Sequence, residues 1–156
     1  MMKQIPYGIT DFSRIQKENY YYVDKTMFIE KIEMQPPYLF LIRPRRFGKS
    51  LTLAMLEAYY DVNHAEQFDE LFGQLYIGQH PTKLHNQFLI MRFNFSEVSS
   101  NVNEVELSFK LHCCSKLKDF VFKYEDLLGK ECETPACFKA WIEVGESSNV
   151  KRSVSA

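Results

Sequence analysis

The chain of 156 residues lacks a long apolar run, and no stretch approaches the roughly 20 residues that a membrane-spanning helix needs. Its first residues also lack the apolar core of a secretory signal. Cysteine is scarce, with four in the chain, which argues against a disulfide scaffold. These absences predict a cytoplasmic protein with reduced thiols and no membrane partner.

Neither sign of charge is in excess, because 19 Lys and Arg residues balance 20 Asp and Glu residues, leaving a formal net charge of −1. Such a chain has no general electrostatic field that would attract nucleic acid or an anionic membrane. Any anion binding must therefore come from a local cluster. The densest basic cluster consists of Arg43, Arg45, Arg46 and Lys49.

The cysteines do not have the spacing of a zinc site. Cys113 and Cys114 are adjacent, and Cys132 and Cys137 lie five residues apart. His112, beside Cys113, does not complete a set of four ligands. We interpret the cysteines as small structural residues, with a metal site as the less favoured alternative.

Apolar residues are plentiful, at 46% of the chain with 15% aromatic, so a folded core is expected. Apolar residues at helical spacing predict helices over 26–34, 49–62, 64–73, 104–128 and 134–144. Continuous apolar or β-prone runs predict strands at Tyr38–Ile42 and Gln87–Phe95, with a weaker β signal at Tyr20–Asp24.

This order of elements predicts an α/β fold, a P-loop NTPase-like three-layer domain. Two strong strands are few for such a domain, so we expect it to be incomplete. We assign residues 1–142 to this domain and residues 143–156, which are small, polar and aperiodic, to a disordered or aberrant tail. An exposed sheet edge in an incomplete domain would favour self-association.

Residues 43–50, RPRRFGKS, lie between the expected strand and the expected helix. Gly48, Lys49 and Ser50 match the second half of the phosphate-binding pattern G-x-x-x-x-G-K-[ST], while Arg43 occupies the place of its first glycine. In such loops, backbone N–H groups and the lysine hold phosphates, and the hydroxyl binds Mg²⁺. The predicted nucleotide-binding residues are Arg45, Arg46, Phe47, Gly48, Lys49, Ser50 and Leu51, with Ser50 also the predicted metal ligand.

Arginine at the first position constrains the backbone of the loop. A left-handed arginine would cost roughly 1 kcal/mol or more. Because Pro44 pushes the residue before it towards extended geometry, we expect Arg43 to keep a negative φ. The alternative to a nucleotide site at this point is a basic surface turn that caps the helix.

Three ordered segments resemble the bacterial AAA-ATPase-like family: IPYGITDFSRIQKENYYYVDKTMFIEKI, YLFLIRPRRFGKSLTLAMLEAYY and LIMRFNFS. The resemblance covers about residues 4–142, and Arg43 in place of glycine is ordinary within this family. It implies an ATPase-type domain that takes ATP and Mg²⁺, in a family whose members often carry a C-terminal nuclease-like domain. The family's acidic strand, ending D-E-Y-D, is not found here, so we expect an N-terminal fragment.

Without that acidic strand, ATP hydrolysis is not predicted, and whether the chain is an enzyme stays open. Asn94 and Glu97 are weak substitutes for the missing carboxylates. By analogy, Tyr20, Tyr21, Tyr22 and Asp24 could contact adenine, although packing on the core is the simpler role. The alternatives to a nucleotide-binding domain are a nucleic-acid or phosphate-binding module that uses the basic cluster, and an inactive fragment.

Overall fold

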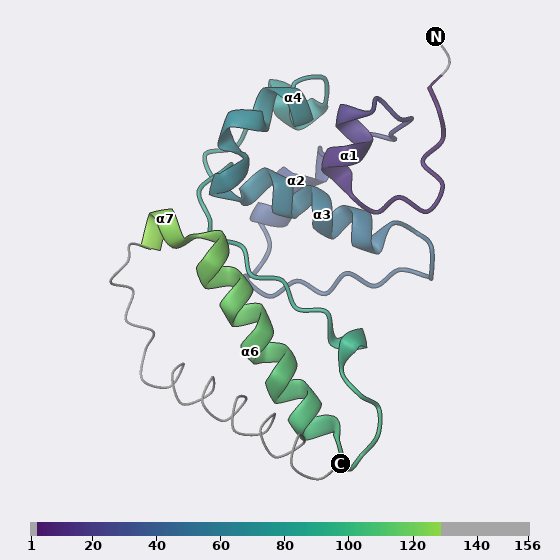
Figure 1. The fold of residues 1–156 in the computed structure, drawn as a ribbon. Helices are drawn as coiled ribbons and strands as arrows, with labels where there is room; N and C mark the ends of the chain where they lie inside the picture. The colour runs from purple at the N-terminus through teal and green to yellow at the C-terminus, as the bar shows by residue number, and fades with distance from the viewer. Residues whose placement is uncertain (1–2, 129–156) are drawn as a thin grey trace. The chain divides into compact units, whose positions relative to one another are not determined.

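The computed structural model describes residues 3–128, and this part of the chain falls into two compact units that divide between Ile90 and Met91 (Figure 1). In the first unit the helical elements are α1 (Phe12–Lys17), α2 (Phe28–Glu33), α3 (Lys49–Tyr60), the 3-10 helix η1 (Val62–Gln67), α4 (Phe68–Phe72) and α5 (Tyr76–Gln79). The described part of the second unit contains the 3-10 helix η2 (Phe95–Glu97), α6 (Val105–Lys123) and α7 (Glu125–Leu128).

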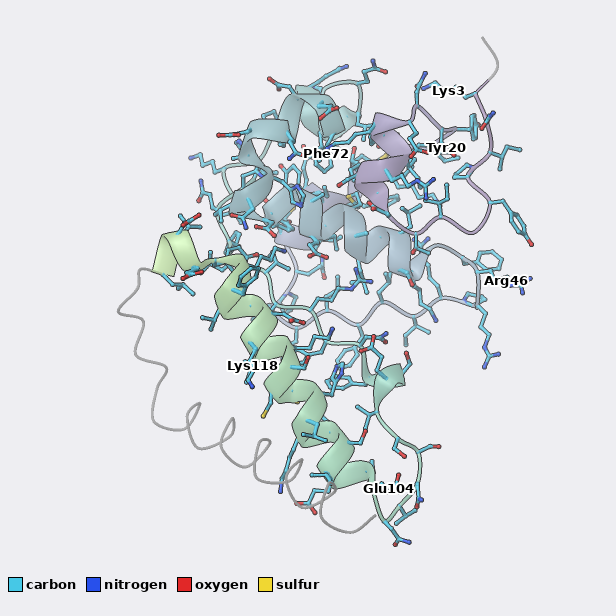
Figure 2. All side chains as sticks on the ribbon, in the orientation of Figure 1. Lys3, Tyr20, Arg46, Phe72, Glu104 and Lys118 are labelled. Carbon is cyan, nitrogen blue, oxygen red and sulfur yellow. The ribbon has the colours of Figure 1, made fainter. Side chains whose placement is uncertain are left out.

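The core of the first unit is built from aromatic side chains of α1, α3 and α4, and Figure 1 shows α1, α2 and α4 grouped around α3. Phe12 of α1 stacks on Phe72 of α4 with ring centroids 5.0 Å apart. Tyr59 of α3 meets the same Phe72 ring edge-on at 5.4 Å. All three side chains are fully buried, and Figure 2 shows Phe72 inside this group of helices. These rings, together with buried aliphatic side chains such as Ile29, Leu71 and Ile77, form the apolar core of this unit.

Polar contacts fix both ends of α2. At its start, Asp24 accepts hydrogen bonds from the backbone N–H and hydroxyl of Thr26, and its second oxygen accepts one from the N–H of Tyr76 in α5. At its end, Glu33 accepts hydrogen bonds from the hydroxyls of Tyr60 at 3.0 Å and Thr82 at 2.8 Å. Helix α2 is thus tied to α5 and to the last turn of α3.

The second unit has an aromatic cluster beside α6. Phe95 of η2 stacks on Phe93 at 5.9 Å and on Phe109 of α6 at 5.7 Å. The backbone N–H of Asn94 donates to Nε2 of the buried His112, which is also on α6. These contacts hold the segment before η2 against the long helix.

The expected α/β three-layer fold is wrong, because the described residues form helices and connecting segments without a sheet. Tyr38–Ile42 is exposed, and none of its backbone groups makes a hydrogen bond within the described residues. The Gln87–Phe95 run contributes an isolated parallel bridge between Asp61 and Phe88. An apolar run becomes a strand only when another strand satisfies its backbone groups, and this partner is not found among residues 3–128.

The helices expected over 26–34 and 49–62 are confirmed in type and approximate position as α2 and α3. The helix expected over 64–73 is divided into the 3-10 helix η1 and the α-helix α4, and the helix expected over 104–128 ends at Lys123 and is followed by the short α7. The helix expected over 134–144 and the tail expected over 143–156 lie outside the described residues, and the assignment of 1–142 as one domain stays a prediction. Of the helices described, none has both the length and the apolar character needed to cross a membrane.

Candidate functional site

The RPRRFGKS loop has an unusual backbone at two positions. Arg46 has φ 65° and Gly48 has φ 76°, both in the left-handed region. Arg43 is not among the positive-φ residues, which agrees with the expectation from Pro44. Because left- and right-handed residues in succession turn backbone N–H groups towards one side, this conformation suits an anion.

The loop ends where α3 begins. Gly48 is the N-cap of α3, and no side chain caps this end. The N–H of Thr52 makes the first helical bond, to the Gly48 carbonyl at 2.8 Å, so the amides of Lys49, Ser50 and Leu51 precede that ladder. A helix of 12 residues therefore points its positive end and its free donors at the space before Lys49.

Positive charge is concentrated here without carboxylates to neutralise it. The sequence has no Asp or Glu between Glu33 and Glu57, a span that contains Arg43, Arg45, Arg46 and Lys49. Among the described residues, no carboxylate pairs with any of these four side chains within 4.0 Å. Figure 2 shows the Arg46 side chain directed away from the helices, so this charge faces solvent.

Lys49 has an internal acceptor. Its Nζ donates to the backbone carbonyl of Arg43 at 3.0 Å, which closes the loop upon itself. The contact is exposed, and a carbonyl is a weaker partner for an ammonium than an anionic oxygen is. The lysine is thus held near the loop and remains available to an anion that enters it.

The seven residues predicted to bind a nucleotide lie in sequence order along this loop and the first turn of α3. Arg45, Arg46 and Phe47 are in the loop, and the Phe47 ring is 64% exposed. The Ser50 side chain is exposed on the first turn, as a metal ligand would have to be. Leu51 is partly buried and packs on the apolar core, which leaves its backbone N–H as the group that could meet a ligand.

Two residues of the segment proposed by analogy to contact adenine, Tyr22 and Asp24, make contacts within the protein, whereas Tyr21 is exposed. Both carboxylate oxygens of Asp24 accept hydrogen bonds from Thr26 and Tyr76, as described above. Tyr22 meets the Phe12 ring edge-on at 5.4 Å, and burial, followed by the nearby Asp24 carboxylate, raises the pKa of Tyr22 to about 12. Tyr22 therefore packs against the core, and Asp24 ties the start of α2 to α5.

A second polar region lies in the second unit, where a cavity of about 480 Å³ is lined by Glu97, Ser99, Glu104, Leu107, Ser108, Leu111 and His112. Both ring nitrogens of His112 are occupied. Nε2 accepts from the Asn94 N–H at 3.3 Å, and Nδ1 lies 3.4 Å from a Glu97 oxygen. The other Glu97 oxygen accepts from the Asn94 side chain at 2.8 Å. This histidine is therefore a structural residue, and neither Asn94 nor Glu97 is a free metal ligand.

The cysteines on α6 also behave as structural residues. Cys114 is buried and Cys113 half-buried, and burial raises the pKa of the Cys114 thiol. Within residues 3–128, no group of three His, Cys, Asp or Glu side chains could hold a metal ion. Cys132 and Cys137 lie outside the described residues.

Comparisons with known proteins identify the family. A family model described as "Predicted AAA-ATPase" matches residues 6–154. The "Uncharacterized protein in vnfD 5'region" of Azotobacter chroococcum mcd 1 is 51% identical over 55 residues, which cover 35% of this chain but only 11% of that protein. No solved structure matches the chain. Because the family model matches nearly the whole chain, the chain belongs to the AAA-ATPase-like family.

Proposed function

We propose that residues 43–51 form a nucleotide-binding loop that takes ATP together with Mg²⁺. The observation that carries this proposal is the junction between the loop and α3, where a left-handed Gly48 precedes an uncapped helix start and where, among the described residues, no carboxylate pairs with Arg43, Arg45, Arg46 or Lys49. Family membership supports ATP as the nucleotide. The charge of the cluster also suits a triphosphate, which is the most highly charged of the common nucleotides.

Each group in the loop has a distinct part in this proposal. The amides of Lys49, Ser50 and Leu51 donate to phosphate oxygens, because they have no partner in the helical ladder. Lys49 leaves the Arg43 carbonyl and binds a phosphate oxygen in its place. The Ser50 hydroxyl is the protein's ligand for Mg²⁺. Arg45 and Arg46 add charge at the exposed side of the loop.

The proposal concerns binding and does not include hydrolysis. Hydrolysis needs a carboxylate that helps to hold the metal and a group that orients the attacking water. The Asp24 carboxylate is satisfied by backbone N–H groups, and the Glu97 carboxylate by Asn94 and His112. Neither is free for such a role.

The test is a titration of the full chain with a fluorescent ATP analogue, with and without Mg²⁺. Wild-type protein is expected to bind, and Lys49→Ala to bind about tenfold to a hundredfold more weakly, since a hydrogen bond to a charged group contributes about 1.5–3 kcal/mol. Ser50→Ala should lose the benefit of Mg²⁺ and retain part of the affinity for the nucleotide.

Lys83→Ala is the matched control, because Lys83 is an exposed lysine of the same unit outside the loop. It should leave ATP affinity unchanged. Helix content, measured by circular dichroism, must stay the same in all three variants. The proposal fails if folded wild-type protein does not bind the analogue, or if Lys49→Ala and Lys83→Ala bind it equally well.

A further inference from the structure

The chain from Tyr38 to Lys49, here called the basic–aromatic segment, exposes large aromatic rings beside the cations of the loop. Tyr38 is 87% exposed and Phe40 is 88% exposed. Phe47 adds a third exposed ring within the loop itself. In contrast, the Phe12, Tyr59 and Phe72 rings of the same unit are fully buried. Three exposed rings within ten consecutive residues form an apolar patch of the kind that marks a binding site.

The backbone leaves these rings free to contact a ligand. The described residues offer no hydrogen bond to any backbone group of Tyr38–Ile42, so this stretch belongs to no helix or sheet and its backbone is open. Exposure alternates along it, because Tyr38, Phe40 and Ile42 are more exposed than Leu39 and Leu41. This alternation is typical of an extended chain, in which the first two rings project on the same side.

Charge indicates what kind of ligand this is. The segment carries Arg43, Arg45, Arg46 and Lys49 and has no acidic residue, although the chain has a net charge of −1. A partner that matches it must supply several negative charges in a row together with flat apolar faces. An acidic peptide supplies charge without a regular array of such faces, whereas a nucleic-acid strand supplies both at every residue.

We propose that the basic–aromatic segment binds single-stranded nucleic acid. The phosphates lie along the arginines of the loop, and unpaired bases stack on Tyr38, Phe40 and Phe47. A duplex is excluded as the preferred ligand, because its bases are stacked on one another and do not offer their faces to side chains. This inference goes beyond nucleotide binding, since Tyr38 and Phe40 precede the nucleotide-binding loop.

The experiment measures the fluorescence anisotropy of labelled oligothymidylate and oligouridylate of about 16 nucleotides, the upper end of the usual site size. The full chain is expected to bind at least one of them, with an affinity that falls as salt rises. Tyr38→Ala and Phe40→Ala should each weaken binding about fivefold or more, the range measured for single stacking residues.

Two matched controls have equally exposed rings elsewhere. Tyr7→Ala matches Tyr38→Ala, because Tyr7 is 95% exposed, and Phe122→Ala matches Phe40→Ala, because Phe122 is 81% exposed. Both should bind the oligonucleotides as wild type does. A duplex of the same length should bind more weakly than the single strand.

Three results would overturn the inference. The first is a lack of binding to either oligonucleotide at low salt. The second is an affinity that replacing the loop arginines lowers but that is the same for Tyr38→Ala and Tyr7→Ala. This result would indicate charge attraction without stacking. The third is a dimer in sedimentation experiments that Phe40→Ala dissociates while oligonucleotide binding is unchanged, since a second copy would then cover these rings.

Discussion

Gly48 shows most directly how one residue shapes the proposed site. Its φ of 76° is a conformation that residues with a Cβ rarely adopt. A Cβ placed there would meet no atom within 4 Å, so the requirement for glycine comes from the backbone and not from crowding. The sequence pattern and the local geometry agree at this position.

Gly48→Ala is therefore expected to lower the free energy of unfolding by about 1–2 kcal/mol, the cost of a left-handed L-residue. Gly48→Asn should lose less, because asparagine tolerates this conformation better than alanine does. Urea unfolding followed by circular dichroism measures both variants. Equal stability of the alanine and asparagine variants would show that Gly48 does not hold this conformation in solution.

Arg46 has nearly the same φ, 65°, without the freedom of glycine. Keeping an arginine there costs roughly 1 kcal/mol of strain, and strained positions of this kind gather at functional sites. The cost is consistent with a side chain retained for its charge, as the proposed phosphate contact requires.

Two partly buried phenols give stability a pH dependence in the alkaline range. Burial raises the pKa of Tyr22 to about 12, and burial followed by the hydrogen bond to Glu33 raises the pKa of Tyr60. Raised values mean that the folded state favours the neutral phenol. This stabilisation is complete below the tyrosine pKa of the unfolded chain, about 10, and is lost as pH rises through the tyrosine pKa of the folded protein.

The free energy of unfolding should therefore fall between about pH 10 and about pH 12 in wild-type protein. Tyr22→Phe should reduce this fall, because phenylalanine keeps the ring contact with Phe12 and has no proton to lose. Tyr21→Phe is the control, since Tyr21 is exposed in the same segment. A fall of the same size in Tyr22→Phe and Tyr21→Phe would rule out Tyr22 as its source.

At the scale of elements, the hydrogen bonds of Asp24 and Thr26 join the start of α2 to the start of α5. Thr26 is fully buried, and its hydroxyl accepts from the N–H of Ile77 at 3.2 Å while donating to Asp24. The two elements are 51 residues apart along the chain at this contact. Few apolar contacts of α5 could replace it, because α5 has only four residues.

Asp24→Ala should lower the free energy of unfolding by about 2–3 kcal/mol, since it leaves the N–H of Tyr76 and both donors of Thr26 without their acceptor. Thr26→Val keeps the shape of the side chain and should cost about 1–2 kcal/mol. Lys25→Ala, which lies between them and is exposed, is expected to be neutral. If Asp24→Ala is as stable as Lys25→Ala, the hydrogen bonds of Asp24 do not stabilise the contact between α2 and α5.

The sequence was a good guide to the helices and a poor guide to the strands, for a physical reason. A helix satisfies its hydrogen bonds locally, so the spacing of apolar residues in 49–60 was sufficient to predict α3. A strand depends on residues far away in the chain. The run Tyr38–Ile42 has the composition of a buried strand, yet the described residues supply no partner for it.

In the candidate site, too, some features could be predicted from residue types and others could not. Gly48, Lys49 and Ser50 were found from their pattern, and the negative φ of Arg43 followed from Pro44. The left-handed Arg46 and the bond from Lys49 to the Arg43 carbonyl were not predictable, because no residue-type rule specifies them. The hydrogen bond from Tyr76 to Asp24 was also not predictable, since these two residues are distant in sequence.

For the whole molecule, the distribution of charge matters more than its sum. A net charge of −1 gives no general attraction for polyanions, so both proposed ligands depend on the same four cations. ATP and an oligonucleotide should therefore exclude each other. The two proposals differ in the other groups they need, which are the α3 amides and Ser50 for ATP, and Tyr38 and Phe40 for the oligonucleotide.

This difference predicts that each of two substitutions impairs the binding of one ligand and not of the other. Adding ATP and Mg²⁺ should release a bound oligonucleotide from wild-type protein, measured as a fall in anisotropy. In Ser50→Ala, Mg²⁺ should no longer assist this release, while direct oligonucleotide binding stays as in wild type. In Phe40→Ala, ATP affinity should be unchanged although the oligonucleotide binds more weakly.

Salt separates the two ligands further. Oligonucleotide binding should weaken steeply between about 50 mM and about 200 mM salt, because each neutralised phosphate releases counterions. ATP binding should persist at about 200 mM, since directional hydrogen bonds and Mg²⁺ contribute to it beyond charge alone. If both ligands bind at once, or if their salt dependences coincide, the shared cations cannot be the common site, and at least one of the two assignments must move to another surface of the protein.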